Sequence, residues 1–116
     1  MTAQIARGPA ENWDEMPWEF VREGVERKLV TGQGATLQLT RLMPGHEPRP
    51  HSHRYEQIAY ILAGQIDFFV EDTVTRVGPG GVLIIPPDAR HWGEVVGDEP
   101  VLNLDVFTPP RDDLGA

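Results

Sequence analysis

Short apolar segments separated by turn-forming residues make up most of this sequence. Several alternate hydrophobic and polar side chains with a period of two, and none shows the 3.6-residue stripe of an amphipathic helix. Twelve glycines and eleven prolines punctuate the chain, many of them between these segments. The pattern predicts strands at 35–43, 57–63, 65–72, 73–77, 81–86 and 101–107. Short strands with frequent turns favour an all-β fold, a sandwich or a small barrel.

The predicted strand 101–107 has two different faces. Its odd-numbered positions mix polar and apolar side chains, whereas its even-numbered positions are all leucine or valine. We expect the even-numbered face to pack into the protein and the mixed face to line a polar cavity, with Asp105 and Phe107 on it. The alternative is an outer strand with Asp105 exposed to solvent. Arg111 follows two prolines, which would aim its side chain unless it belongs to a mobile tail.

The chain length of 116 residues fits one domain. No internal repeat or linker divides it, so we predict an N-terminal arm at 1–16 and a single domain at 17–116. Trp13 and Trp18 are expected to cover a sheet edge or a subunit interface.

The net charge of -8 argues against nucleic acid or an anionic membrane as a partner. An anionic substrate would need a local cluster of arginines to overcome this overall field. The absence of cysteine excludes disulfides, zinc–thiolate sites and thiol nucleophiles. No apolar run is long enough to span a bilayer and the first residues lack a signal-peptide core, so we expect a cytoplasmic protein.

Histidines carry the candidate chemistry. His51 and His53 stand two residues apart, so in an extended chain their imidazoles point to the same side. Glu56 and Gln57 follow, and a turn could return either beside the pair. Taken alone, two histidines in a polar loop are as consistent with an exposed loop as with a metal site.

His91 follows an apolar segment and a Pro-Pro-Asp turn, which would deliver a third imidazole at the start of a further strand, from a distant part of the chain. Three neutral imidazoles and one oxygen donor suit one divalent ion such as nickel, zinc, manganese, iron or cobalt. The fourth histidine, His46, is expected to be an exposed loop residue.

These residues fall into two motifs that resemble those of cupins. The first is Gly45-(five residues)-His51-x-His53-(three residues)-Gln57-(six residues)-Gly64, and the second is Gly80-(five residues)-Pro86-x-Asp88-(two residues)-His91. The resemblance implies a single cupin barrel, that is, a jelly roll or double-stranded β-helix, with a metal held by His51, His53, Gln57 and His91. Gln57 stands where the motif most often has Glu, and Glu56 should point away. Asp88 replaces a usual glycine, and Val95 replaces the closing asparagine.

A closer resemblance runs over most of the chain. The segments 17–42, 51–70 and 104–113 resemble the small KdgF-like cupins of pectin and alginate breakdown. Members of that group help to linearise 4,5-unsaturated uronate monosaccharides. The resemblance implies that Asp105, Phe107 and Arg111 are active-site residues and that the partner is a small anionic sugar.

Metal-assisted opening of an unsaturated uronate is therefore the leading hypothesis. The alternatives are an iron-dependent cupin dioxygenase, a cyclase of the polyketide type, and a non-catalytic metabolite-binding cupin. A wholly apolar, aromatic cavity without arginine would favour the cyclase. We also expect a homodimer, because small cupins commonly pair through their edge strands.

Overall fold

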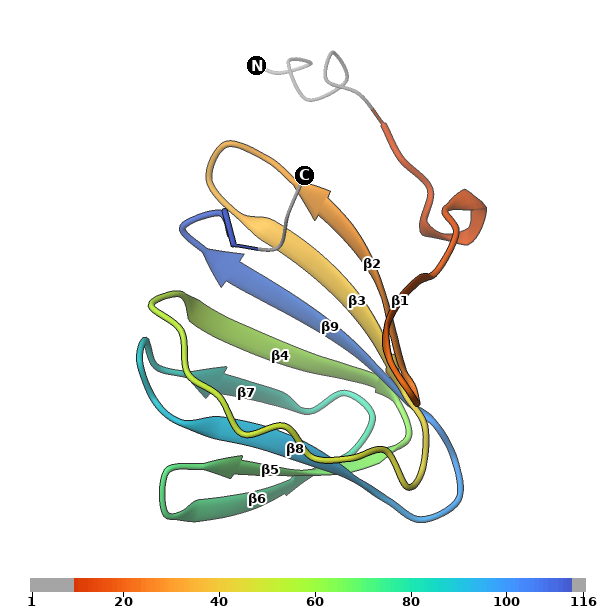
Figure 1. Cartoon of the computed structure of the whole chain (residues 1–116), viewed down its shortest axis with the longest axis vertical. Helices are drawn as coiled ribbons and strands as arrows, with labels where there is room; N and C mark the ends of the chain where they lie inside the picture. The colour runs from red at the N-terminus through yellow and green to blue at the C-terminus, as the bar shows by residue number, and fades with distance from the viewer. Residues whose placement is uncertain (1–9, 114–116) are drawn as a thin grey trace.

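The computed structural model describes residues 10–113, which contain nine strands and one turn of 3-10 helix (Figure 1). The 3-10 turn is η2 (Trp13–Glu15). The strands are β1 (Glu19–Arg22), β2 (Val25–Thr31), β3 (Thr36–Leu42), β4 (Glu56–Ala63), β5 (Gln65–Val70), β6 (Thr73–Val77), β7 (Val82–Ile85), β8 (His91–Val96) and β9 (Val101–Thr108). Residues 1–9 of the predicted arm lie outside the described residues. Within residues 10–113, no helix is long and apolar enough to cross a membrane.

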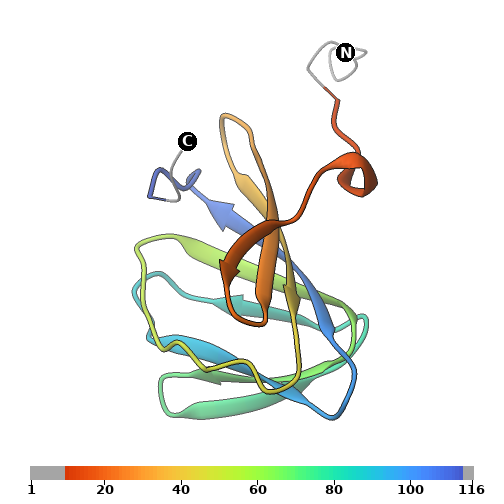
Figure 2. The same ribbon diagram turned by 45° about the vertical axis from the view of Figure 1, so that its right-hand side comes forward.

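Two antiparallel sheets form the domain. The larger has the order β1-β2-β3-β9-β4-β7, and the smaller has the order β6-β5-β8. Figure 2 shows both sheets curving around a shared interior. Sequence-adjacent strands lie in different sheets at β4–β5, β6–β7, β7–β8 and β8–β9, so the chain crosses between layers as a jelly roll does. The predicted all-β barrel is confirmed.

All the predicted strands are present, but β1 and β2 were not predicted. The β2 sequence mixes charged and apolar residues on both faces, so its alternation is weak. The structure explains one of these charges. Lys28 is buried, its Nζ donates to the Trp13 carbonyl at 2.5 Å, and it lies 4.5 Å from the centre of the Trp18 ring. The Trp18 ring therefore covers Lys28 of β2, and Trp13 contributes its backbone carbonyl, so the expected covering of a sheet edge or a subunit interface stays a prediction.

The structure confirms that the mixed face of β9 lines a polar cavity, but the expectation that the leucine and valine face packs into the protein was wrong. The mixed face points into the barrel, and its members are all nearly inaccessible: Val101 at 0%, Asn103 at 4%, Asp105 at 4% and Phe107 at 2% exposure. The leucine and valine face is half-buried on the outside of the larger sheet. An apolar face is usually the inner one, but here the interior holds a polar site whose hydrogen bonds replace those lost to water.

Two tight turns fix the ends of the strands that carry the site. Gly64, between β4 and β5, has φ +80°, and a Cβ there would collide with the Pro100 carbonyl oxygen. Asp88, just before β8, has φ +67°. The cupin motif usually has glycine at this position, and aspartate is among the residues that best tolerate the left-handed conformation. The turn is thus preserved despite the substitution.

Candidate metal centre

Three histidines from two distant segments converge at one point. His51 and His91 form an isolated antiparallel bridge, in which each backbone N–H donates to the other residue's carbonyl at 3.1 and 2.8 Å. His53 lies two residues beyond His51, so its ring points to the same side. One ring nitrogen from each histidine lies within 4.8 Å of the others. The backbone bridge therefore positions the third imidazole beside the first two.

Hydrogen bonds fix the orientation of all three rings. The Nδ1 atoms of His51, His53 and His91 lie 2.7, 3.0 and 2.9 Å from the carbonyl oxygens of Arg49, Tyr55 and Ala89. A neutral imidazole facing a carbonyl carries its proton on that nitrogen, so each Nε2 keeps a free lone pair. This arrangement prepares histidines to bind a metal through Nε2.

Gln57 is the oxygen donor beside these imidazoles. Its Oε1 lies 3.2 Å from His53 Nε2, and its Nε2 donates to Asp105 Oδ1 at 2.8 Å. The carboxylate accepts only from the amide nitrogen, so it turns the amide oxygen towards the histidines. Gln57 is buried on the inner face of β4, whereas Glu56 is only half-buried and points to the other face. The arrangement supports Gln57, not Glu56, as the fourth ligand.

The donor set fits a divalent first-row metal. His91 Nε2 is buried and has no hydrogen-bond partner, which costs free energy unless something else binds it. Burial lowers the pKa of His91 to about 4, so the ring is neutral at pH 7 and its lone pair is available. Three imidazoles and one amide oxygen carry no charge, and a bound dication would keep its full charge.

Asp105 lies at the centre of a buried polar network. Besides Gln57, Asn103 Nδ2 donates to both carboxylate oxygens at 3.0 Å. Burial raises the pKa of Asp105 to about 6, although the hydrogen bonds from Gln57 and Asn103 and the charge of Arg111 act in the opposite direction. The alternative of an exposed Asp105 on an outer strand is wrong. Asn103 was not among the candidate residues, although its place on the Asp105 face was a usable signal.

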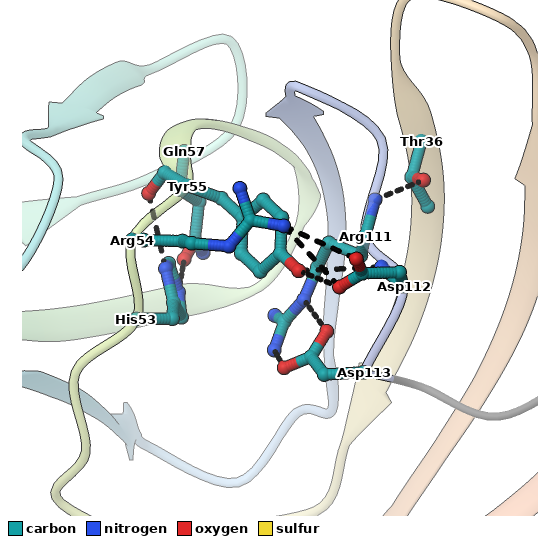
Figure 3. Close-up of polar contacts among 8 residues, drawn as sticks. All are labelled: Thr36, His53, Arg54, Tyr55, Gln57, Arg111, Asp112 and Asp113. Atoms are coloured by element: carbon teal, nitrogen blue, oxygen red, sulfur yellow. Dashed lines mark hydrogen bonds and ion pairs between the residues drawn. The ribbon is translucent and has the colours of Figure 1, made fainter.

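Arg111 is held in place rather than mobile (Figure 3). Its backbone N–H donates to Thr36 Oγ1 at 2.9 Å, and its guanidinium makes a two-bond pair with Asp113 at 2.9 and 2.6 Å. The same group lies 4.6 Å from the centre of the Phe107 ring and 5.1 Å from that of Tyr55. Figure 3 also shows Tyr55 donating to Asp112, which ties this segment to the loop after His53. The mobile-tail alternative is therefore wrong.

One cavity of about 270 Å³ connects these groups. His51, Gln57, His91, Asp105, Phe107 and Arg111 all line it. The prediction for His46 was wrong: this residue is half-buried and lines the same cavity, because Gly24 leaves room for it beneath the β1–β2 turn. Arg22 and Arg49 also line it and were not among the candidate residues. Their positions depend on how distant segments pack, which local periodicity does not report.

Residues 38–107 match the family model of the cupin domain, so the chain belongs to the cupin family. A curated relative is the pectin degradation protein KdgF of Dickeya dadantii (strain 3937). It is 29% identical over 103 residues, which cover 87% of this chain and 93% of the relative. KdgF from Halomonas sp. has a similar structure, with a TM-score of 0.84 and 25% identity, over 93% of this chain and 99% of that one. An RmlC-like cupin from Shewanella frigidimarina NCIMB 400 shares the fold, with a TM-score of 0.81 and 21% identity over 90% and 94% of the two chains.

Proposed function

We propose that this protein is a metal-dependent enzyme that linearises 4,5-unsaturated uronate monosaccharides. The observation that carries the proposal is the joint presence, in one cavity, of the neutral histidine–glutamine cluster, the buried Asp105 carboxylate and several arginines. The likeness to KdgF proteins, one of which is named for pectin degradation, supports a uronate as the substrate.

His51, His53, Gln57 and His91 would hold the ion. When bound, a divalent cation of this kind supplies Lewis-acid polarisation and a template for oxygen ligands of the substrate. The identity of the ion is open among nickel, zinc, manganese, iron and cobalt, because imidazole and amide-oxygen ligands bind all of these ions.

Asp105 is the proposed general acid/base. In ring opening, the alkene carbon gains a proton and the hydroxyl of water adds to the carbon that bears the ring oxygen. The resulting hemiketal then breaks its bond to the ring oxygen, which takes the proton released by that hydroxyl. Asp105 lines the cavity and is the only carboxylate among the described residues that do so, which supports this role.

Arg111 and Phe107 would bind the substrate. The Arg111 guanidinium lies at the cavity wall with its position set by Phe107 and Asp113. A carboxylate of the substrate would compete with Asp113 for this cation or share it. Phe107 forms an apolar wall beside His53, with their ring centres 5.5 Å apart.

The alternatives differ in what the cavity should look like. A polyketide-type cyclase would favour an aromatic cavity without arginine, but four arginines line this one: Arg22, Arg27, Arg49 and Arg111. A dioxygenase would use iron on the same ligands and would consume oxygen, which an oxygen electrode distinguishes. A non-catalytic cupin would bind the sugar without changing it.

Homodimer formation and a cytoplasmic location stay predictions. β1 is the edge strand of the larger sheet, and its Phe20 side chain is 70% exposed. An uncovered edge strand with an apolar side chain is a surface on which a second copy could pair. Sedimentation of the parent protein and of Phe20→Ser would test this surface.

A reaction test decides the main proposal. Freshly prepared unsaturated galacturonate is mixed with the purified protein, and the loss of ring-alkene absorbance is followed against the uncatalysed reaction. We expect faster loss with the parent protein and a background rate with His91→Ala. An equal rate for the two proteins, or no rate above background for the parent, would reject the proposed activity.

A further inference from the structure

Arg22, His46 and Arg49 form a basic cluster in the cavity wall, and Arg49 lies two residues before His51. Arg22 ends β1, whereas His46 and Arg49 lie in the segment between β3 and β4. All three line the cavity. We propose that this cluster is a second anion-binding subsite, which receives the carboxylate of a second uronate unit in an acidic disaccharide.

The register of the larger sheet separates Arg22 from the end of β9 that contacts Arg111. Arg22 pairs with Val25, Val25 with Leu42, and Leu42 with Val101 at the start of β9. The β9 residue that contacts Arg111 is Phe107. Phe107 and Val101 are separated by roughly 20 Å of extended strand. In Figure 1 the β1–β2 turn and the segment after β3 lie at the right, and β9 ends at the left. The backbone positions of Arg22 and Phe107 therefore lie towards opposite ends of the larger sheet.

The two arginines of the cluster have charges available for a ligand. Arg27 and Arg111, which line the same cavity, are paired with Glu19 and Asp113. Arg22 and Arg49 make no ion pair with any residue in 10–113. Arg22 Nε is moreover buried without a hydrogen-bond partner. In a protein with a net charge of -8, unpaired arginines at a cavity wall indicate an anionic ligand.

His46 adds a hydrogen-bond acceptor to the cluster. Its Nδ1 lies 3.2 Å from the Glu47 carbonyl oxygen. This nitrogen therefore donates, and Nε2 is left as an acceptor. Nε2 is buried and has no partner. Burial lowers the pKa of His46, which favours the neutral ring. The two cations and one acceptor match a carboxylate next to a sugar hydroxyl.

Acidic groups also face the cluster and limit its charge. Burial and the neighbouring Arg49 lower the pKa of Arg22, and the charge of Glu47 opposes this only in part. Glu94 faces His46 but accepts a hydrogen bond from Trp92 Nε1 at 3.0 Å. Neither carboxylate pairs with Arg22 or Arg49. The formal charges of the two arginines and these two carboxylates cancel, but both guanidinium groups stay without an ion-pair partner among residues 10–113 and can bind an anionic ligand.

A second hollow on the outside shares this cluster and indicates that the ligand is longer than one sugar ring. An outer groove, lined by Phe20, Met43, Pro44 and Pro100 among others, also includes Arg22, His46 and Arg49 in its wall. A ligand with one ring near the histidines would pass this cluster on its way out. A second acidic ring would then lie over it. This inference rests on the proposed function for its sugar chemistry, because it takes the inner ring to be a uronate.

The test compares galacturonate with saturated digalacturonate, neither of which carries the reactive alkene. Binding to the purified protein is measured by titration calorimetry, with metal content determined for every sample. We expect the disaccharide to bind at least roughly tenfold more tightly, since one charge-assisted hydrogen bond is worth about this much. In Arg22→Gln/Arg49→Gln this ratio should fall to about one. Arg76→Gln removes an exposed cation outside both hollows and should keep the parent ratio.

Three outcomes would overturn the subsite: a parent protein that does not prefer the disaccharide, a ratio that the double substitution leaves unchanged, or the same loss of ratio in Arg76→Gln. If the double variant does not fold, Arg49→Gln alone changes an exposed loop residue and should lower the ratio severalfold. The absorbance assay on the unsaturated monosaccharide is scored separately. The absorbance assay can therefore reject the proposed activity while calorimetry still shows the arginine-dependent preference. Calorimetry can likewise reject the subsite while the absorbance assay still shows the activity.

Discussion

Replacing Asp105 by asparagine should remove proton transfer and leave the fold and the metal ligands in place. The new amide oxygen can still accept from Gln57 and Asn103, which now lie 2.8 and 3.0 Å from Oδ1. Its NH2 group would face the Asn103 donor that now lies 3.0 Å from Oδ2, so one hydrogen bond is lost. That loss costs about 1 kcal/mol, and it is offset in part because no charge is buried. We therefore expect a melting temperature within roughly 5 °C of the parent.

The rate should change far more than the stability. A lost general acid/base slows a reaction by roughly two to four orders of magnitude. The assay is the loss of alkene absorbance by Asp105→Asn and by the parent, at equal metal content. Asn103→Ala is the matched control, because it removes two hydrogen bonds from the carboxylate but keeps the carboxylate itself. Turnover by Asp105→Asn within about threefold of the parent, or an equal loss in Asn103→Ala, would refute the role in proton transfer.

Three further predictions concern the proposed metal ligand Gln57, the Arg111–Asp113 pair and the turn at Gly64. Gln57→Glu would place two carboxylates where a hydrogen bond of 2.8 Å now joins Gln57 to Asp105. We expect this variant to keep one metal per chain by elemental analysis, but the added negative charge should weaken galacturonate binding roughly tenfold or more. Arg111→Ala should weaken galacturonate binding, and Asp113→Asn should strengthen it by freeing the guanidinium, so calorimetry must show opposite signs. Gly64 has a φ of +80° and a close carbonyl neighbour, both of which disfavour a Cβ. Gly64→Ala should therefore lower the free energy of unfolding in urea by about 2 kcal/mol, and an unchanged midpoint would contradict this.

The metal cluster is the part of the site that the sequence predicts best. A spacing of two residues places His51 and His53 on one side of an extended chain whatever surrounds them. The turn before His91 and the position of Gln57 come from motif spacing, and the structure brings all four side chains together. These positions depend on short sequence spacings or on tight turns, so they can be predicted without knowing how distant segments pack.

The parts that were missed or reversed depend on long-range packing. Alternation correctly divided β9 into two faces and put the mixed face on the cavity. The rule that an apolar face packs inward failed for the leucine and valine face, because the interior is taken by Asn103 and Asp105, which are hydrogen-bonded to each other. His46 and Arg22 meet only because the β1–β2 turn packs beneath the segment after β3. No local sequence pattern predicts a contact between segments so far apart in the chain.

A metal titration of the ring-opening rate tests most directly whether the protein opens unsaturated uronates with a bound metal ion. The protein is stripped with a chelator, and the loss of unsaturated-galacturonate absorbance is measured as nickel, zinc, manganese, iron(II) or cobalt is added back. We expect a background rate without metal and, for at least one ion, a rise that reaches its plateau at about one equivalent per chain, with no rise in His91→Ala. A stripped protein that keeps the full parent rate would contradict a metal-dependent reaction.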